Sequence, residues 1–190
     1  MSFVDTIEES LSQFIIDNQC QVCGFIHSAG YMKLIPLKMI TVNFFQTTFN
    51  VNVISAAIIA KILNKKKING DKLKNIVLVS SNISNYGAKA SSAYGASKSA
   101  TDGLMRCLAI EMAPAVRVNS VLPGGVETSM TKQIYENTEL INRMVATCPL
   151  GAGTAKDICG TVKFLLSNDS RWITGQQITI DGGRTVNITG

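Results

Sequence analysis

The sequence of 190 residues has a single histidine, His27, and an odd number of cysteines, five. A hydrolase built on a Ser-His-Asp triad would have to use His27, and the sequence holds no GxSxG turn for its nucleophile. Cys20 and Cys23 form a CxxC pair, but no second pair or histidine follows at zinc-finger spacing, so we expect buried thiols and no metal site. Scattered cysteines in odd number are typical of reduced thiols inside a cell.

Long apolar runs and a basic N-terminal flank are also missing. The longest nearly apolar stretch, residues 51–60, is about half a membrane span, and the acidic N-terminus shows no signal peptide. Much of the net charge of +5 comes from lysines around the turn at residues 69–71, without interleaved aromatic residues. We therefore expect a cytoplasmic protein with no membrane or nucleic-acid partner, in which these lysines form a solvated loop.

What is present is an ordinary globular balance, with 46% hydrophobic and 16% charged residues, sufficient for one domain over residues 1–190. Short apolar runs predict strands at residues 21–26, 75–81, 116–122 and 176–180. Helical periodicity predicts helices at residues 5–17, 43–63, 92–112 and 155–166, whereas residues 128–147 are amphipathic and ambiguous. This alternation predicts an α/β fold, a doubly wound parallel sheet with helices on both faces.

Residues 80–100 hold the most informative pattern. A β-prone run leads into Ser80 and Ser81, and after a loop of small residues Tyr94 and Lys98 stand four apart in a predicted helix. That spacing places the phenol and the ammonium on one face. Because a nearby cation favours the phenolate, we expect Lys98 to lower the tyrosine pKa from its usual value of about 10. A strand-end hydroxyl, a phenol and a lysine would together form a proton-transfer site.

Several further motifs stand in a fixed order around this pair. They are His27-Ser-Ala-Gly30, Asn50-Val-Asn52, Ser81 thirteen residues before Tyr94, Tyr94-Gly-Ala-Ser-Lys98, Arg117-Val-Asn-Ser-Val-Leu-Pro-Gly124, Thr128, Thr174-Gly175-Gln176 and Asp181-Gly-Gly183. In this order they resemble the short-chain dehydrogenase/reductase family, and most of all its 3-oxoacyl-carrier-protein reductase-like members. The resemblance runs from about residue 4 to the end.

The resemblance implies a catalytic set and a cofactor. Tyr94 would exchange a proton with the oxygen of a carbonyl or alcohol substrate, Ser81 would hydrogen-bond that oxygen, Lys98 would hold the nicotinamide ribose, and Asn52 would position a water. NAD or NADP would supply or accept the hydride. The cofactor-binding residues implied are Ser28, Ala29, Gly30, Tyr94, Lys98, Pro123, Gly124, Val126 and Thr128. For Thr128, an amide contact to the cofactor and a helix cap remain alternatives.

The resemblance also bears on substrate and assembly. Met130, Tyr135 and Met144 fall where the family carries its substrate loop, which suggests an apolar substrate. The helices that carry Asn52 and Tyr94 are rich in small residues and form a dimer interface in the family. We therefore expect a homodimer or homotetramer.

One family feature is not found in these residues. The family begins with a strand and a glycine-rich TGxxxGxG turn for the cofactor pyrophosphate, and the 190 residues contain neither. We expect the chain to correspond to the C-terminal three quarters of the family domain, with residues 21–26 as an exposed apolar edge. A non-catalytic family member that binds a partner or itself is the alternative function.

Overall fold

Four parallel strands form one sheet in the computed structural model, which describes residues 3–136 and 138–187. The strands are β1 (Gly24–His27), β2 (Asn75–Val79), β3 (Arg117–Pro123) and β4 (Gln177–Ile180), and they lie in the order β1-β2-β3-β4. All three neighbouring pairs are parallel. The predicted parallel α/β architecture is therefore confirmed.

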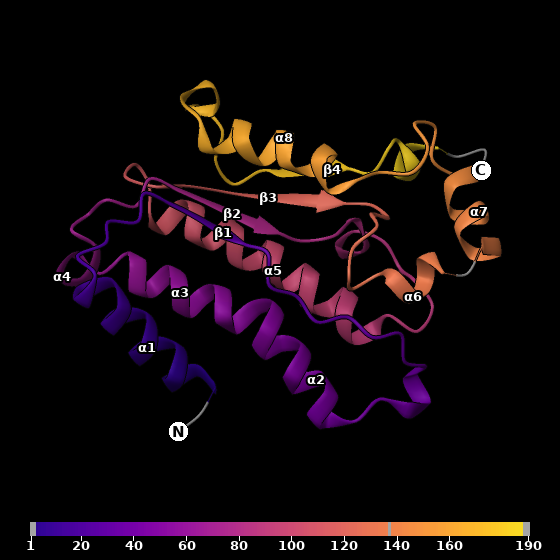
Figure 1. The fold of residues 1–190 in the computed structure, drawn as a ribbon, viewed down its shortest axis with the longest axis horizontal. Helices are drawn as coiled ribbons and strands as arrows, with labels where there is room; N and C mark the ends of the chain where they lie inside the picture. Colours follow the sequence, from indigo (N-terminus) through magenta and orange to yellow (C-terminus); the bar gives the residue numbers. More distant parts are fainter. Residues whose placement is uncertain (1–2, 137, 188–190) are drawn as a thin grey trace.

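Helices cover both faces of this sheet (Figure 1). On one side lie α1 (Phe3–Asp17), α3 (Ser55–Leu63) and α5 (Ser92–Glu111), and on the other lies α8 (Ala155–Leu166). Successive side chains of a strand point to opposite faces. On β2, accordingly, Ile76 and Leu78 join the core under α3 and α5, while Val77 packs on the α8 side.

The long helix predicted at residues 43–63 is interrupted by a widened turn. It consists of α2 (Val42–Phe49), a π-helical segment η2 (Asn50–Ile54) and α3. This helix of 22 residues is long and apolar enough to cross a membrane, although a soluble core helix passes the same test and such a helix is weak evidence. Extra residues in a helical turn are frequent at functional sites, and Asn52 lies in this one.

The strand predicted at residues 21–26 begins later, at Gly24, for a local reason. The side chain of Asn69 accepts a hydrogen bond from the backbone N–H of Val22 (2.7 Å) and donates one to its carbonyl (2.8 Å). These groups are therefore occupied before they can join the ladder. The predicted burial of the CxxC thiols is wrong, because Cys20 is half-buried and Cys23 is exposed in this segment.

The remaining helices are short. The lysine-rich segment contains α4 (Lys66–Asn69), and the ambiguous residues 128–147 hold α6 (Lys132–Tyr135) and α7 (Thr138–Ala146). One-turn 3-10 segments η1, η3, η4 and η5 occupy Leu37–Met39, Asn82–Ser84, Asn168–Ser170 and Arg184–Val186.

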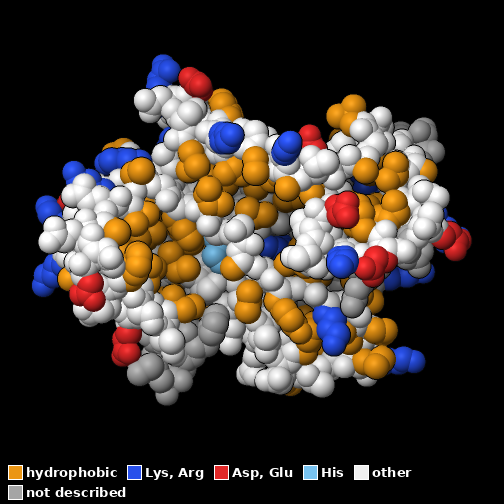
Figure 2. Space-filling view, viewed as in Figure 1, with side chains coloured by type: hydrophobic (Ala, Val, Ile, Leu, Met, Phe, Trp, Pro, Cys, Tyr) orange, Lys and Arg blue, Asp and Glu red, His pale blue; other side chains and the backbone are white. Residues whose placement is uncertain are grey.

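Strand β1 lies at one edge of the sheet, where its only strand partner among the described residues is β2. Ile26 projects toward the α8 side of this edge and is 44% exposed. Phe164 of α8 is exposed to a similar degree, 40%. Figure 2 shows apolar side chains gathered across the middle of this face. The predicted apolar edge strand is therefore present.

Candidate active site

The carboxyl ends of β1, β2 and β3 open into a pocket of about 630 Å³. In parallel α/β sheets this end of the strands is where ligands bind, and the volume lies within the range of small-molecule sites. The predicted residues that line it are Ser28, Gly30, Ser81, Tyr94, Lys98, Pro123, Gly124, Val126 and Thr128. The structure thus brings all predicted site residues to one cavity except Ala29, which is exposed beside it, and Asn52.

Ser81 and Tyr94 form the centre of the site. Ser81 follows β2 and its hydroxyl accepts a hydrogen bond from the N–H of Ile83 (3.3 Å), which caps the turn η3. The Ser81 hydroxyl is also hydrogen-bonded to the hydroxyl of Tyr94, a buried residue of the first turns of α5. Two hydroxyls from different elements therefore meet at one point on the pocket wall.

The pKa of Tyr94 differs from the sequence prediction. Burial raises the pKa of its phenol above the usual value, and the hydrogen bond from Ser81 lowers it only in part. The ammonium of Lys98 lies 5.7 Å from the ring centroid of Tyr94, and it donates its hydrogen bond elsewhere, to the carbonyl of Val79 (2.7 Å). The expectation that Lys98 lowers the pKa of Tyr94 is therefore not met in this structure.

Lys98 is itself a buried cation with a nearby counter-charge. Burial lowers its pKa to about 8, and the carboxylate of Asp102 opposes that change. The two oxygens of Asp102 accept hydrogen bonds from the hydroxyls of Ser120 (2.7 Å) and Ser80 (3.0 Å). Sequence reasoning missed Asp102, although its position four residues after Lys98, on the same helical face, was a usable signal.

Asn52 lies behind the pocket with its whole amide in use. Its oxygen accepts from the N–H of Tyr31 (2.7 Å), and its nitrogen donates to the carbonyl of Tyr31 (3.1 Å) and to the hydroxyl of Ser97 (2.8 Å). Ser97 in turn donates to the backbone carbonyl of Tyr94 (2.7 Å). Asn52 therefore fixes the strand-to-loop exit at Tyr31 against the helix that carries Tyr94, and its role with water stays a prediction.

His27, at the end of β1, completes the set of buried ionisable groups. Its Nε2 lies 2.8 Å from the hydroxyl of Ser55, and its Nδ1 is buried without a hydrogen-bond partner among the described residues. Burial, and secondly the charge of Lys98, lower the pKa of His27 to about 4. The imidazole is therefore neutral at pH 7.

The pocket fits the nicotinamide half of a dinucleotide cofactor. A side-chain carbon added at Gly30 would lie 3.1 Å from Cε of Met130 and 3.9 Å from the ammonium of Lys98, so glycine keeps the approach to Lys98 open. Thr128 also lines the pocket, and its N–H donates to the hydroxyl of Thr131 (2.9 Å). No helix begins at Thr128 itself, since α6 begins at Lys132. Among the described residues, no cluster of His, Cys, Asp or Glu could hold a metal ion.

A second cavity of about 280 Å³ shares Ser81 and Tyr94 with the first. The three residues predicted to belong to a substrate loop, Met130, Tyr135 and Met144, line it. Arg184 lines it as well. Sequence reasoning missed Arg184, which immediately follows the Asp181-Gly-Gly183 motif. Tyr94 and Ser81 therefore lie between two compartments.

Comparisons with known proteins agree with this architecture. Residues 6–185 match the family described as Enoyl-(Acyl carrier protein) reductase. The chain is 32% identical over 161 residues to an uncharacterized oxidoreductase of Methylorubrum extorquens, and this match covers 83% of the chain and 64% of the relative. A short-chain dehydrogenase/reductase of Hericium erinaceus is 32% identical over 186 residues, with 95% of the chain and 73% of the relative covered.

Among solved structures, a mutant 4-hydroxyisoleucine dehydrogenase complexed with NADH and succinate superimposes with a TM-score of 0.90 at 26% identity. It covers 98% of this chain and 78% of that one. The chain thus spans about two thirds to three quarters of the length of these relatives.

Proposed function

The chain belongs to the short-chain dehydrogenase/reductase family, and we propose that it is an oxidoreductase that reduces a carbonyl or oxidises an alcohol with NAD or NADP. One observation carries the proposal. The hydrogen-bonded hydroxyls of Ser81 and Tyr94 lie on the wall of a cavity that Gly30 and Lys98 also line. Two hydroxyls at one point suit a substrate oxygen, so we favour a C=O bond over the C=C bond suggested by the name of the matching family.

Tyr94 acts as the general acid in the direction of reduction. Because burial raises the pKa of its phenol, Tyr94 is protonated at neutral pH and has a proton to give to the carbonyl oxygen. The bound cofactor supplies the hydride to the carbonyl carbon. Ser81 hydrogen-bonds the same oxygen, and it also stabilises the phenolate that the proton transfer leaves, since its hydrogen bond lowers the pKa of Tyr94. In oxidation the phenolate takes the proton back from the alcohol.

The residues around Lys98 would hold the nicotinamide and its ribose. Lys98 offers an ammonium for the ribose hydroxyls, and Ser28, Gly30, Pro123 and Gly124 supply the surrounding walls. A solved relative at 26% identity contains NADH, which supports a nicotinamide cofactor here without distinguishing NAD from NADP.

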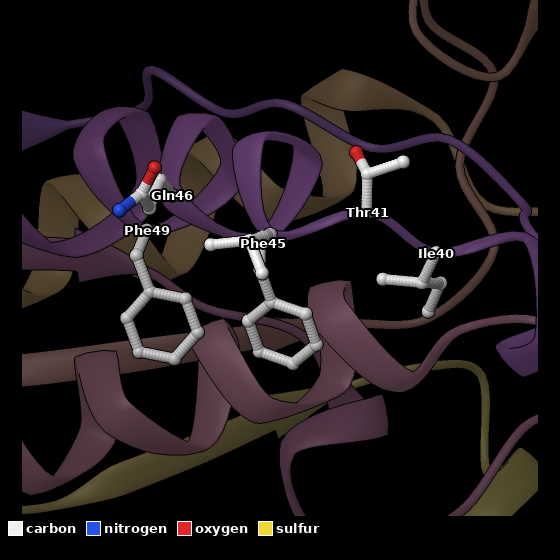
Figure 3. Close-up of a pocket in the computed structure, with 6 residues that line it drawn as sticks. Ile40, Thr41, Phe45, Gln46 and Phe49 are labelled. Atoms are coloured by element: carbon white, nitrogen blue, oxygen red, sulfur yellow. The ribbon is translucent and has the colours of Figure 1, made fainter.

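We further infer that the chain forms a dimer through α2. Phe45 and Phe49 project side by side from this helix, with ring centroids 5.8 Å apart and planes 22° apart (Figure 3). Together with Ile40 and the 75% exposed Val42 they line an apolar depression on the surface. A second copy of this chain is the occupant, in agreement with the family's dimer interface. Sedimentation of the purified chain at micromolar concentration should give a dimer, and a monomer would contradict this assembly.

The test of the activity is a hydride-transfer assay. We expect this domain, joined to the family's TGxxxGxG cofactor turn that residues 1–190 do not contain, to consume NADH or NADPH, followed at 340 nm, with at least one member of a panel of small ketones and aldehydes. Tyr94→Phe should lower kcat by about 10² to 10⁴-fold, since it removes only the hydroxyl group that gives the proton.

Tyr31→Phe is the matched control, because it also removes one phenol oxygen, from a ring that packs on Phe44. It should keep the wild-type rate. Turnover by Tyr94→Phe at the wild-type rate would show that the assigned mechanism is wrong.

A further inference from the structure

The smaller cavity beside Tyr94 has one charged residue in its wall. Its lining includes the apolar side chains of Met32, Ile83, Met130 and Met144, and among the described residues the only charged member is Arg184. Since Arg184 is exposed and yet lines the cavity, its side chain lies at the cavity rim. No carboxylate within the described residues forms a salt bridge with it.

The backbone places Arg184 at this rim through the turn that precedes it. Gly183 adopts a left-handed conformation (φ 82°), which favours glycine. The carboxylate of Asp181 accepts hydrogen bonds from the N–H groups of Gly183 (3.1 Å) and Thr185 (3.0 Å). Asp181 is therefore engaged by the turn itself, and the guanidinium of Arg184 keeps its donors.

A second donor lines the same cavity. The hydroxyl oxygen of Tyr135 is buried, and no described residue offers it a hydrogen-bond partner. A buried hydroxyl without a partner is costly, unless a ligand completes its hydrogen bonding. Burial, and secondly the nearby carboxylate of Glu127, raise the pKa of Tyr135, so the phenol remains protonated and can donate.

We propose that the substrate is an oxo acid or hydroxy acid, whose carboxylate is bound by Arg184 and Tyr135. Arginine has the planar, forked donors that match a carboxylate, and Tyr135 adds one more donor to the lining of the same cavity. A single negative charge is favoured over a phosphate ester, because Glu127 also lies near Tyr135. The inference deepens the proposed function by naming the substrate class of the same site.

The methionines define the rest of that substrate. Met32, Met130 and Met144 line the same cavity as Arg184 and Tyr94, and flexible thioether side chains adapt to varied apolar shapes. The carbon chain between the two functional groups is therefore apolar. In the reaction, the oxo acid gains a hydride at its carbonyl carbon and the Tyr94 proton at its oxygen, while NADH or NADPH becomes NAD⁺ or NADP⁺.

The experiment compares each acid with its methyl ester. The same protein as in the hydride-transfer assay is tested with NADH and with NADPH on 2-oxohexanoate, 4-oxopentanoate, 5-oxohexanoate and their methyl esters. We expect kcat/KM for the best acid to exceed that for its ester, and Arg184→Gln to lower the value for the acid by about tenfold. The ester should change by less than about threefold.

Matched variants separate charge from structure. Arg171→Gln removes another exposed arginine, at a helix end outside both cavities, and should leave acid and ester rates unchanged. Arg184→Lys keeps the positive charge and should restore part of the preference for the acid. Tyr135→Phe should lower the rate with the acid by about threefold, a smaller effect than Arg184→Gln because it removes one uncharged donor.

A binding measurement decides the inference even without turnover. Saturation-transfer NMR with 5-oxohexanoate and its methyl ester should show contact by the acid that Arg184→Gln abolishes. If no carbonyl compound oxidises either cofactor, the proposed activity fails, and this NMR comparison still tests the carboxylate subsite. Equal binding of acid and ester, or equal loss of both in Arg184→Gln, would overturn the inference.

Discussion

The two walls of the larger cavity are held in different ways. On the α5 side, buried polar groups are joined in sets. Asn52 bonds both backbone groups of Tyr31, and Asp102 accepts hydrogen bonds from a hydroxyl just after β2 and from one in the middle of β3. On the β1 side, the wall consists of an edge strand with an exposed Ile26. His27 of the same strand is buried, and its Nδ1 has no partner among the described residues. The first wall is therefore fixed by directional bonds, and the second mostly by one ladder and apolar contact.

The two walls therefore have different roles: one carries the reacting groups, and the other mainly encloses the cavity. The atoms that would act on a substrate, those of Ser81, Tyr94 and Lys98, all belong to the hydrogen-bonded wall. The β1 wall supplies surface to the cavity and one ionisable group that stays neutral. Substitutions in the first wall should therefore cost more stability than substitutions in the second, and three variants test this comparison.

The largest effect is expected for Asn52→Ala. The substitution leaves the N–H and the carbonyl of Tyr31 and the hydroxyl of Ser97 without their partner, in a place from which water is excluded. Losing several buried hydrogen bonds at once should lower the free energy of unfolding by about 3 kcal/mol. Urea denaturation followed by circular dichroism measures the change.

Asn18→Ala is the matched control for this loss. The exposed Asn18 makes one hydrogen bond, to the carbonyl of Phe14 (2.9 Å), at the end of α1. Its removal should cost less than about 0.5 kcal/mol. If both variants lost equal stability, the bonded wall would be no more rigid than an exposed helix end, and the contrast between the two walls would be lost.

A smaller, pH-dependent effect is expected from His27, at the end of β1. Because its folded pKa is about 4 and its unfolded pKa about 6.5, the unfolded chain binds more protons between these values. The free energy of unfolding should therefore fall as pH falls, by about 2 kcal/mol between pH 7 and pH 5 from this group alone.

His27→Gln removes the titrating group and keeps an amide that can bond Ser55. Denaturation of both proteins across this pH range isolates the contribution of His27, since the carboxylates are common to both. The variant should lose less stability than the parent chain on acidification. Parallel pH curves would show that the imidazole titrates equally in the folded and unfolded chains.

Patterns local in sequence were enough to predict much of this architecture. The apolar runs located all four strands, and the periodicity of residues 155–166 gave α8 with the bounds that the structure has. The pairing of Tyr94 with Lys98 followed from helical spacing, because residues four apart share a face in any helix.

Properties that depend on distant partners were beyond those patterns. The start of β1 depends on Asn69, which is 47 residues after Val22. The ammonium of Lys98 donates to a carbonyl 19 residues before it and does not lower the pKa of Tyr94. Arg184 lines the same cavity as Tyr94, although it lies near the C-terminal end of the 190 residues. A pattern of residue types predicts neither which polar groups become buried nor which hydrogen-bond partners they have in the folded chain.

The smallest effect is expected at the open edge itself, from Ile26→Thr. Ile26 on β1 and Val77 on β2 are neighbours in register, so their side chains point to the same face of the sheet, but Ile26 is 44% exposed and Val77 1%. A hydroxyl at position 26 can reach water, and we expect a loss below about 1 kcal/mol. Val77→Thr places a hydroxyl in the apolar layer under α8 and should cost about 2 kcal/mol. Urea denaturation of the two variants compares them directly, and an equal loss would show that the β1 edge is as well packed in solution as its neighbour.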